Sequence, residues 1–254
     1  MSETHQSSRV SILVKALPQR SANHGETVCC AGVTAHGEFK RLFPIRFRHL
    51  GADAAFKRWD WVKFTYRRPT SDNRAESCHV WENSLRRDGH MPEKERASFL
   101  NPLVSASVKE AEAAGKSLAL IRPRNTRFFY KTKKPDEIEA ERRTYAEAAR
   151  QDSFFDEKLK ALEPSPYEFR FKFEDATGPH DYANGDWEAH AMFFNGRQRE
   201  GTDQATLDWM SKTFNETYPR KGMLFCVGNM ASRRQTWQLL GVLRVDDTGQ
   251  SALF

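Results

Sequence analysis

The chain has 254 residues, of which 39% are hydrophobic and 29% are charged. Its 18 Phe, 6 Trp and 6 Tyr supply enough bulk for a packed core, which argues against global disorder. No window approaches 18 consecutive apolar residues, so we expect no transmembrane helix. The N-terminal sequence also lacks the basic-then-apolar order of a secretory signal. The four cysteines have no framework spacing, and we therefore expect free thiols and a cytoplasmic location.

The net charge of +6 is distributed unevenly along the chain. Residues 1–90 carry 15 Lys and Arg against 9 Asp and Glu, whereas residues 91–254 carry 25 of each kind. Residues 40–68 alone hold nine basic and two acidic side chains. A local surplus of this kind favours a polyanionic partner. We expect no membrane partner, since the sequence predicts no transmembrane helix.

The first 90 residues predict five strands and one helix. Residues 59–67 alternate apolar with polar side chains, with one slip at Trp61 and Val62, and the short Gly-containing link after residue 34 is typical of a hairpin. Helix formers dominate residues 48–59. The predicted strands are 9–17, 25–34, 38–45, 59–67 and 75–82. This order, with the helix between the third and fourth strands, is that of an OB-fold, a five-stranded barrel.

The remainder of the chain predicts a second β-rich region with larger helical insertions. Residues 134–163 predict a long helix, because Pro135 and acidic residues stand in its first turn. Residues 165–175 alternate aromatic and charged side chains and predict the clearest strand of the chain. The other expected elements are two short helices broken near Asn101 and Pro102, strands 117–124, 126–133, 222–230 and 236–245, and helices 185–197 and 202–218.

These elements predict a β-rich α+β protein made of two OB-like five-stranded barrels. We assign residues 1–90 to a basic N-terminal OB-like domain and residues 91–116 to a helical connector. Residues 117–254 form the C-terminal OB-like domain, which carries a helical insertion. The second half repeats the pattern of elements of the first half, without a repeat at the level of residues.

A basic and aromatic stretch between residues 40 and 68 has the composition that single-stranded nucleic acid requires. Cations neutralise phosphates and release counterions, and aromatic rings stack on splayed bases at roughly 1–3 kcal/mol each. In the alternative interpretation the aromatics are barrel core and the cations are a solvated face. The candidate binding residues are Arg41, Phe43, Arg46, Phe47, Arg48, Trp59, Trp61, Lys63, Arg67 and Arg68.

A second basic run occupies residues 121–134, and no acidic residue lies between positions 113 and 135. Its candidate binding residues are Arg122, Arg124, Arg127 and Lys131. If this run lies beside the first stretch, the two would form one groove. That juxtaposition is a hypothesis.

Four titratable residues between positions 180 and 188 form the only candidate catalytic cluster. They are His180, Asp181, Asp186 and Glu188. Such a group could bind a divalent metal or supply acid and base, although it lacks the spacing of the zinc hydrolase motif. The alternative is that Asp186 caps a helix packed through Trp187 and the remaining acids are exposed. Because the chain contains no Cys-x2-Cys pair, a structural zinc site is not expected.

Several short pieces spread over most of the chain form a recognisable set. They are Gly25-Glu26-Thr27-Val28-Cys29, Arg41-Leu42-Phe43-Pro44-Ile45 with Arg48, Trp61, Thr70-Ser71-Asp72, His180-Asp181, Asp186-Trp187-Glu188 and the closing TWQLLGVL. This set resembles bacterial proteins described as containing a dual OB domain, a largely uncharacterised family. The resemblance implies two OB-like barrels and carries over no catalytic residue.

We therefore expect a nucleic-acid-binding protein of the bacterial cytoplasm that holds single-stranded DNA or RNA, or another polyanion. One alternative is a metal-assisted enzyme that acts on nucleic acid or nucleotides through the cluster at residues 180–188. Another is an adaptor subunit with protein partners in a larger bacterial assembly. No cofactor is expected beyond the divalent metal of the enzyme alternative, and the sequence leaves enzymatic activity open.

Overall fold

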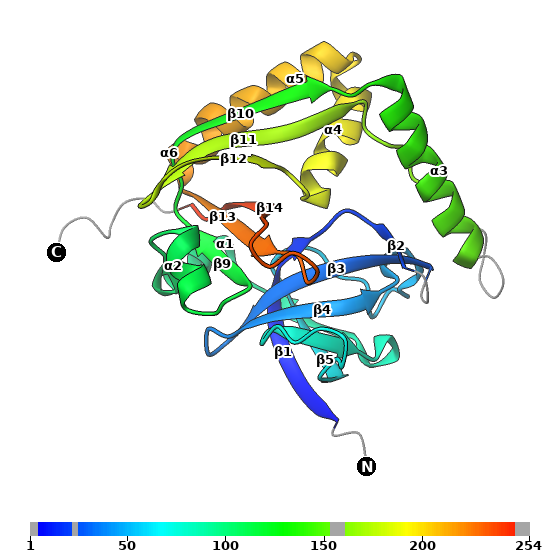
Figure 1. The fold of residues 1–254 in the computed structure, drawn as a ribbon, viewed down its shortest axis with the longest axis vertical. Coiled ribbons are helices and arrows are strands. Elements are labelled where there is room, and N and C mark those ends of the chain that lie inside the picture. The colour runs from blue at the N-terminus through cyan, green and yellow to red at the C-terminus, as the bar shows by residue number, and fades with distance from the viewer. Residues whose placement is uncertain (1–4, 22–24, 153–160, 247–254) are drawn as a thin grey trace. The chain divides into compact units, whose positions relative to one another are not determined.

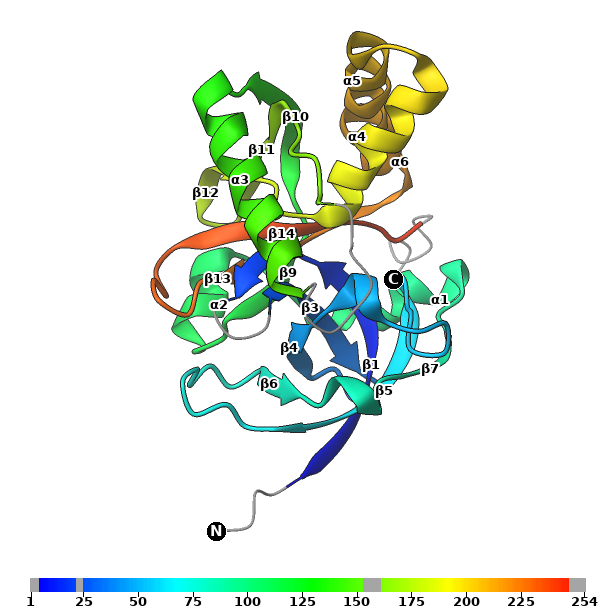
Figure 2. The ribbon, with the colours of Figure 1, turned by 90° about the vertical axis from the view of Figure 1, so that its right-hand side faces the viewer.

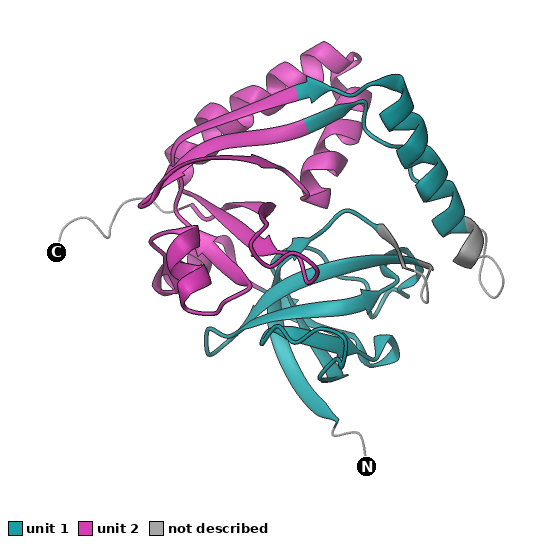
Figure 3. Ribbon diagram, in the orientation of Figure 1, with its two compact units in different colours: residues 1–90, 131–168 teal, residues 91–130, 169–254 magenta. Residues whose placement is uncertain are grey.

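The computed structural model is a mixed α+β structure that describes residues 5–21, 25–152 and 161–246 (Figure 1). Two compact units emerge from the internal contacts, residues 1–90 with 131–168 and residues 91–130 with 169–254 (Figure 3). The units thus group residues 131–168 with the first 90 residues, whereas the sequence grouped them with the C-terminal domain. Among the described helices, none combines the length and the apolar character that crossing a bilayer requires.

Five strands of the first unit close into an OB-like barrel. They follow one another in the order β1, β3, β4, β6 and β5, and β5 pairs back to β1. All neighbours are antiparallel except β4 and β6, which run parallel. The strands are β1 (Gln6–Lys15), β3 (Gly25–Thr34), β4 (Phe39–Ile45), β5 (Asp60–Arg67) and β6 (Ser77–Val80). The five strands predicted for this half are confirmed, with ends shifted by a few residues.

The barrel interior is built by alternation along each strand. On β5, Val62, Phe64 and Tyr66 are buried, and the residues between them face outward. Close approach of β1 and β3 requires a glycine at position 32, because a Cβ there would lie 2.5 Å from the carbonyl oxygen of Ser11. Burial of one apolar face per strand fixes the register, so the outward face is fixed as well.

The helix expected over residues 48–59 is wrong. The segment contains only the 3-10 helix η1 (Phe47–His49) and a single turn in which Ala54 and Ala55 both donate to the carbonyl of Gly51. Gly51 disfavours helix continuation, and Trp59 leaves the segment with a positive φ of 73°. The Trp59 backbone N–H then bonds to Ile12 in the barrel wall at 2.7 Å, so tertiary pairing overrides local helix propensity.

The helix α3 (Pro135–Asp152) packs on β3 and on the short strand β2 (Gln19–Ser21) within the same unit. Burial of Tyr145 raises its pKa to about 12, assisted by the nearby carboxylates of Glu141 and Glu26. The predicted helix over 134–163 is confirmed up to Asp152, whereas residues 161–163 are not helical and residues 153–160 lie outside the described part. The unit also contains η2 (Glu82–Ser84) and the edge strand β7 (Arg86–His90).

The second unit contains two sheets and most of the helices. Its three-stranded sheet has the order β10-β11-β12, and its four-stranded sheet has the order β14-β13-β9-β8. The strands are β8 (Val104–Ser105), β9 (Leu118–Ile121), β10 (Arg124–Thr132), β11 (Tyr167–Asp175), β12 (Gly178–Ala183), β13 (Met223–Asn229) and β14 (Trp237–Arg244). The described strands of this unit form two separate sheets, so the second barrel stays a prediction.

Helices of the second unit fall in the connector and in the insertion that the sequence predicted. The connector contains α1 (Glu93–Leu100), η3 (Asn101–Leu103) and α2 (Val108–Ala113). The insertion between β12 and β13 contains α4 (Trp187–Glu200), α5 (Asp203–Lys212), the π-helix η4 (Thr213–Thr217) and α6 (Tyr218–Lys221). Figure 2 shows α4 and α5 packed side by side. An aromatic core of Phe128, Phe169, Phe171, Phe173 and Phe225 joins the two sheets.

Candidate functional site

Three side chains form a row across the outside of the barrel. Phe43 on β4 is the register partner of His79 on β6, and His79 is the register partner of Arg67 on β5. Register partners on neighbouring strands point to the same face of a sheet. The row therefore places an aromatic ring, an imidazole and a guanidinium next to one another across three adjacent strands.

The outward direction of this row follows from the burial of its neighbours. Leu42, Cys78, Val80 and Tyr66, which flank the row along the strands, are buried in the barrel. Phe43 is 40% exposed and is the only large apolar side chain exposed in the described part of the chain. A single exposed ring is common on protein surfaces, so the row of Phe43, His79 and Arg67, and not Phe43 by itself, makes this face a candidate contact surface.

The same face continues along β5, β6 and β1. Lys63 is 60% exposed and its Nζ lies 3.0 Å from Asp88 Oδ1, while the Arg9 guanidinium lies over the Trp61 ring at 4.4 Å. Arg9 Nε also contacts Asp88, and the hydrogen bonds from Lys63 and then from Arg9 lower the pKa of this carboxyl. We use the term outer wall for the residues Phe43, Trp61, Lys63, Arg67, His79 and Trp81.

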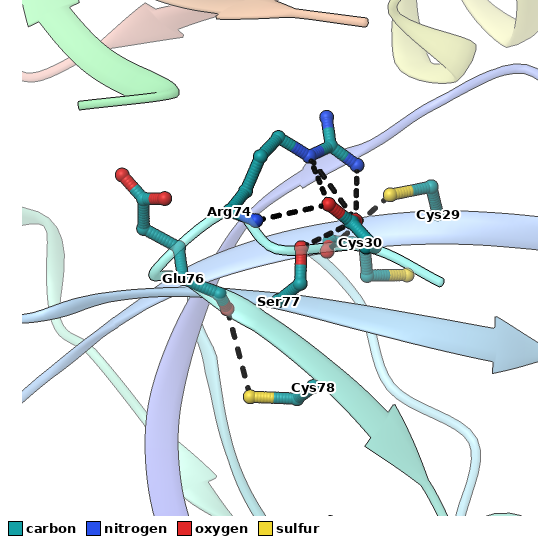
Figure 4. A network of polar contacts seen from close by, with 7 residues as sticks. Cys29, Cys30, Arg74, Glu76, Ser77 and Cys78 are labelled. Carbon is teal, nitrogen blue, oxygen red and sulfur yellow. Dashed lines mark hydrogen bonds and ion pairs between the residues drawn. The ribbon is translucent and has the colours of Figure 1, made fainter. Parts of the chain in front are cut away.

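The loop between β5 and β6 is ordered by one carboxylate at the margin of the outer wall. Asp72 accepts hydrogen bonds from Arg74 Nε and Nη2 at 2.9 and 2.7 Å, and from Ser77 Oγ at 2.6 Å. Burial opposes ionisation of Asp72, but these hydrogen bonds outweigh it and lower its pKa to about 2. Figure 4 shows Arg74 and Ser77 reaching toward this position at the start of β6.

Cys30 and Cys78, near this loop, point into the barrel, and their thiols stay protonated and unreactive. Burial raises the pKa of Cys78 to about 12 and raises that of Cys30 further. The Cys78 thiol donates to the Glu76 carbonyl at 3.6 Å, and the Cys29 thiol contacts the Cys30 carbonyl (Figure 4). In the described ranges, no group of three or more His, Cys, Asp or Glu side chains could hold a metal ion.

Several residues of the predicted basic-aromatic stretch have structural roles instead. Trp59 and Arg41 are buried, and the backbone N–H of Arg41 bonds to the Glu76 carbonyl at 2.8 Å. Arg48 holds the buried carboxylate of Glu26 through two contacts of 2.7 and 2.6 Å.

Three further members of the stretch have partners within the barrel unit. Arg46 Nη2 lies 2.9 Å from Glu82 Oε2. Phe47 packs edge-on against Phe56, with its ring beneath the ammonium group of Lys15. Arg68 is exposed and donates to the Ala75 carbonyl at 2.7 Å. The structure thus places Phe43 and Arg67 in one row with His79. Trp61 and Lys63 lie on the outward side of the other end of β5, and the remaining predicted residues lie elsewhere.

The second basic run lies on β10 and the turn before it. Arg122, Arg124, Arg127 and Lys131 are all exposed. Arg122 Nη2 donates to Asn101 Oδ1 at 2.6 Å, and Arg124 Nη2 donates to the Asp175 carbonyl at 2.8 Å. The hypothesis that this run and the first stretch form one groove stays a prediction.

The predicted catalytic residues do not converge on one point. His180 stacks on Phe173 on the core side of β12, and its Nε2 lies 2.9 Å from Asp175 Oδ2 without the alignment of a hydrogen bond. Asp181 faces the other side and pairs with Arg170 at 2.9 Å.

Asp186 and Glu188 of the same cluster meet at the start of α4. Asp186 is buried, and its carboxylate accepts the backbone N–H of Glu188 at 3.0 Å and that of Val242 at 3.1 Å. Its role is that of a helix cap that ties α4 to β14, as the alternative interpretation expected.

Asp175, the partner of His180, was not among the candidates. Burial would raise its pKa, but donation from the backbone N–H of Val108 and from Thr177, with His180 nearby, lowers it. This carboxylate joins α2 to the turn between β11 and β12, so its function in the fold is structural.

Sequence reasoning missed two members of the outer wall, His79 and Trp81. Both alternate with the buried residues Cys78 and Val80. The predicted strand over 75–82 contained this alternation, and it could have placed both rings outside the barrel.

Two family models match the chain. One is described as Domain of unknown function (DUF8758) and matches residues 6–104, which include the barrel strands. The other is described as Domain of unknown function (DUF8757) and matches residues 100–254. Among curated proteins, no match to the chain was found. Because the second model covers more than half of the sequence, the chain belongs to the family described as Domain of unknown function (DUF8757).

Proposed function

We propose that the chain binds single-stranded nucleic acid on the outer wall of its barrel. The observation that carries the proposal is the row in which exposed Phe43 stands beside His79 and Arg67. Aromatic rings on such a wall stack on bases, and the cations beside them neutralise phosphates. Single strands fit better than duplexes, because bases must be unstacked before a side-chain ring can cover them.

The proposed site shares β4, but not β3, with the face on which OB barrels usually bind oligonucleotides. OB barrels bind oligonucleotides on the face of their second and third strands and on the adjoining loops. In this barrel those strands are β3 and β4, and α3 packs on β3. The proposed path of the nucleic acid runs instead from β4 over β6 to β5. It passes the loop between the fourth and fifth barrel strands, which contains Asp72 and Arg74 and which in OB barrels also contacts oligonucleotides.

The finer assignments from the sequence belong to the same proposal. They are a second OB-like barrel in the C-terminal half, membership among dual OB domain proteins, and a bacterial cytoplasmic location. They rest on the pattern of elements and on the resemblance of the quoted pieces.

The experiment is a binding titration of labelled single-stranded DNA, single-stranded RNA and duplex at several salt concentrations. We expect a single strand to bind more tightly than the duplex, and affinity to fall steeply as salt rises. Phe43→Leu and Arg67→Gln should each weaken binding, whereas Lys94→Gln, which removes an exposed charge on α1, should not. Equal affinity of the two barrel variants and the unmodified protein would refute the proposal.

A further inference from the structure

The imidazole of His5 lies flat on the indole of Trp81. Their ring centroids are 4.2 Å apart and the planes differ by 17°, so the contact is a parallel stack. His5 is exposed and immediately precedes β1, whereas Trp81 is half-buried and follows the last residue of β6. Trp81 therefore presents one flat face outward, and a small planar heterocycle covers that face.

Trp81 is anchored by its backbone on both sides. Its N–H donates to the Thr65 carbonyl of β5 at 3.1 Å, and its carbonyl accepts the Ser84 hydroxyl at 2.6 Å and the Ser84 N–H at 2.9 Å. The indole thus stands on a backbone that is held at both its N–H and its carbonyl, whereas His5 stands outside the strand pairing, which starts at Gln6 opposite Tyr66. Of the two rings, His5 is the one that can leave.

We propose that Trp81 is a base-stacking subsite of the outer wall, which His5 occupies when no nucleic acid is bound and which a nucleobase takes by displacing His5. The inference rests on the proposed function. It adds that Trp81, which the sequence did not single out, binds a nucleobase. It also adds that His5 of the same chain competes for this position. A nucleobase is a planar heterocycle like imidazole but has a larger face, so it gains more stacking area on the same indole.

The position of Trp81 suits a base next to the one at the row of Phe43 and His79. His79 and Trp81 are two residues apart, which corresponds to about 6.6 Å along a strand. Their side chains point to the same side, because both alternate with buried Val80 and Cys78. Lys63 and Arg67 lie on the same outward face of β5, where they can meet phosphates between successive bases.

If His5 competes with the nucleobase for Trp81, its removal should increase the affinity for nucleic acid. A stacked aromatic pair contributes about 0.5–1.5 kcal/mol, so removal of His5 should tighten apparent binding by about twofold to tenfold. Removal of the Trp81 platform should weaken binding by about fivefold to a hundredfold, as for other base-stacking aromatics. Trp81→Phe should retain most of the affinity, because it keeps a ring.

The experiment measures the dissociation constant of a fluorescein-labelled thymidine oligonucleotide for His5→Ala, Trp81→Leu, Trp81→Phe and the double variant His5→Ala with Trp81→Leu. The full chain is used throughout, and circular dichroism verifies that each variant is folded. Matched controls are His36→Ala, an exposed histidine in the turn between β3 and β4, and Trp209→Leu on α5. We expect His5→Ala to tighten binding in the unmodified background and to have no effect once Trp81 is replaced.

The outcomes separate the two proposals. If the unmodified protein binds, and Phe43→Leu weakens binding while His5→Ala and Trp81→Leu match their controls, the subsite is refuted and the proposed function stands. If His5→Ala weakens binding, the imidazole contacts the ligand and does not compete with it, which also overturns the inference. If the unmodified protein fails to bind any single strand, the proposed function itself has failed. Should Trp81→Leu be unfolded, the His5→Ala result alone decides, because His5 is exposed and outside the barrel.

Discussion

The guanidinium of Arg48 donates two hydrogen bonds to the carboxylate of Glu26, from Nε at 2.7 Å and from Nη2 at 2.6 Å. The Glu26 side chain is only 4% exposed. This pair connects the segment after β4 to the start of β3, within the stretch whose cations suggested a nucleic acid contact. Removal of one partner of a buried pair leaves the other charge desolvated, which costs far more than the net stabilisation by the intact pair.

Arg48→Ala should therefore destabilise the protein by about 3 kcal/mol. Urea unfolding followed by circular dichroism measures this change. The matched control is Arg46→Ala, since Arg46 is 40% exposed and its pair with Glu82 is more solvated, so its loss should cost about 1 kcal/mol or less. Equal destabilisation by the two substitutions would contradict the structural role assigned to Arg48.

Asp72 should make the stability of the barrel depend on acid pH. Its pKa is lowered from 3.8 to about 2 in the folded protein, so the unfolded chain binds the proton more tightly. The resulting stabilisation is fully present above about pH 4 and is lost as the pH falls toward 2. Partial exposure of the group reduces it to about 1 kcal/mol.

Asp72→Asn tests this prediction in urea unfolding at neutral pH and at acid pH. The variant should be less stable than the unmodified protein at pH 7, and the difference should shrink as the pH falls from 4 to 2. Asp53→Asn, at an exposed aspartate before β5, is the control and should show no such convergence. If the difference in stability between Asp72→Asn and the unmodified protein does not change with pH, the ionised Asp72 carboxylate does not stabilise the fold.

Asp186 gives a third prediction, which separates a helix cap from a catalytic carboxylate. Asp186→Ala leaves the buried N–H groups of Glu188 and Val242 without their acceptor, and should cost about 3 kcal/mol of stability. Asp181→Ala, at the exposed partner of Arg170, should cost about 1 kcal/mol or less. Thermal unfolding compares the two, and an Asp186→Ala protein as stable as Asp181→Ala would exclude the capping role.

The sequence predicted much of the barrel because its strands alternate. The alternation of residues 59–67 predicts a strand, and the short link after Thr34 predicts the hairpin of β3 and β4. The slip in the alternation at residues 61–62 left the buried face of β5 open, and the structure assigns it to Val62, Phe64 and Tyr66. The helix expected over 48–59 failed because helix propensity is a weak preference, and the bond from Trp59 to Ile12 outweighs it.

The site was harder to predict. The sequence shows where basic and aromatic residues are concentrated, but it does not show which distant residues pair with them. Nothing in the local pattern shows that Arg48 is held by Glu26, 22 residues earlier, or that Arg46 is held by Glu82, 36 residues later. His79 lies outside the basic and aromatic stretch that the sequence singled out. Its register partners Phe43 and Arg67 become visible only when β6 is inserted between β4 and β5.

The outer wall yields the fourth prediction, which concerns the single substitution Phe43→Leu. Loss of one stacking ring should weaken single-strand binding by about 1–3 kcal/mol at fixed salt. Because Phe43 is exposed, the free energy of unfolding should change little. Phe194→Leu, at a half-buried ring on α4, is the control for the change in ring size. Fluorescence anisotropy measures the affinity, and an unaltered dissociation constant for Phe43→Leu would argue against stacking at this position.

The most direct test of the central claim is the dependence of single-strand affinity on salt, compared between the unmodified protein and Arg67→Gln. For each phosphate neutralised on a single strand, the slope of log affinity against log salt is about −0.7. We predict a steep negative slope for the unmodified protein and a slope shallower by about 0.7 for Arg67→Gln, while Lys94→Gln retains the original slope. A flat response of the unmodified protein, or identical slopes for all three proteins, would contradict a nucleic acid site on the outer wall.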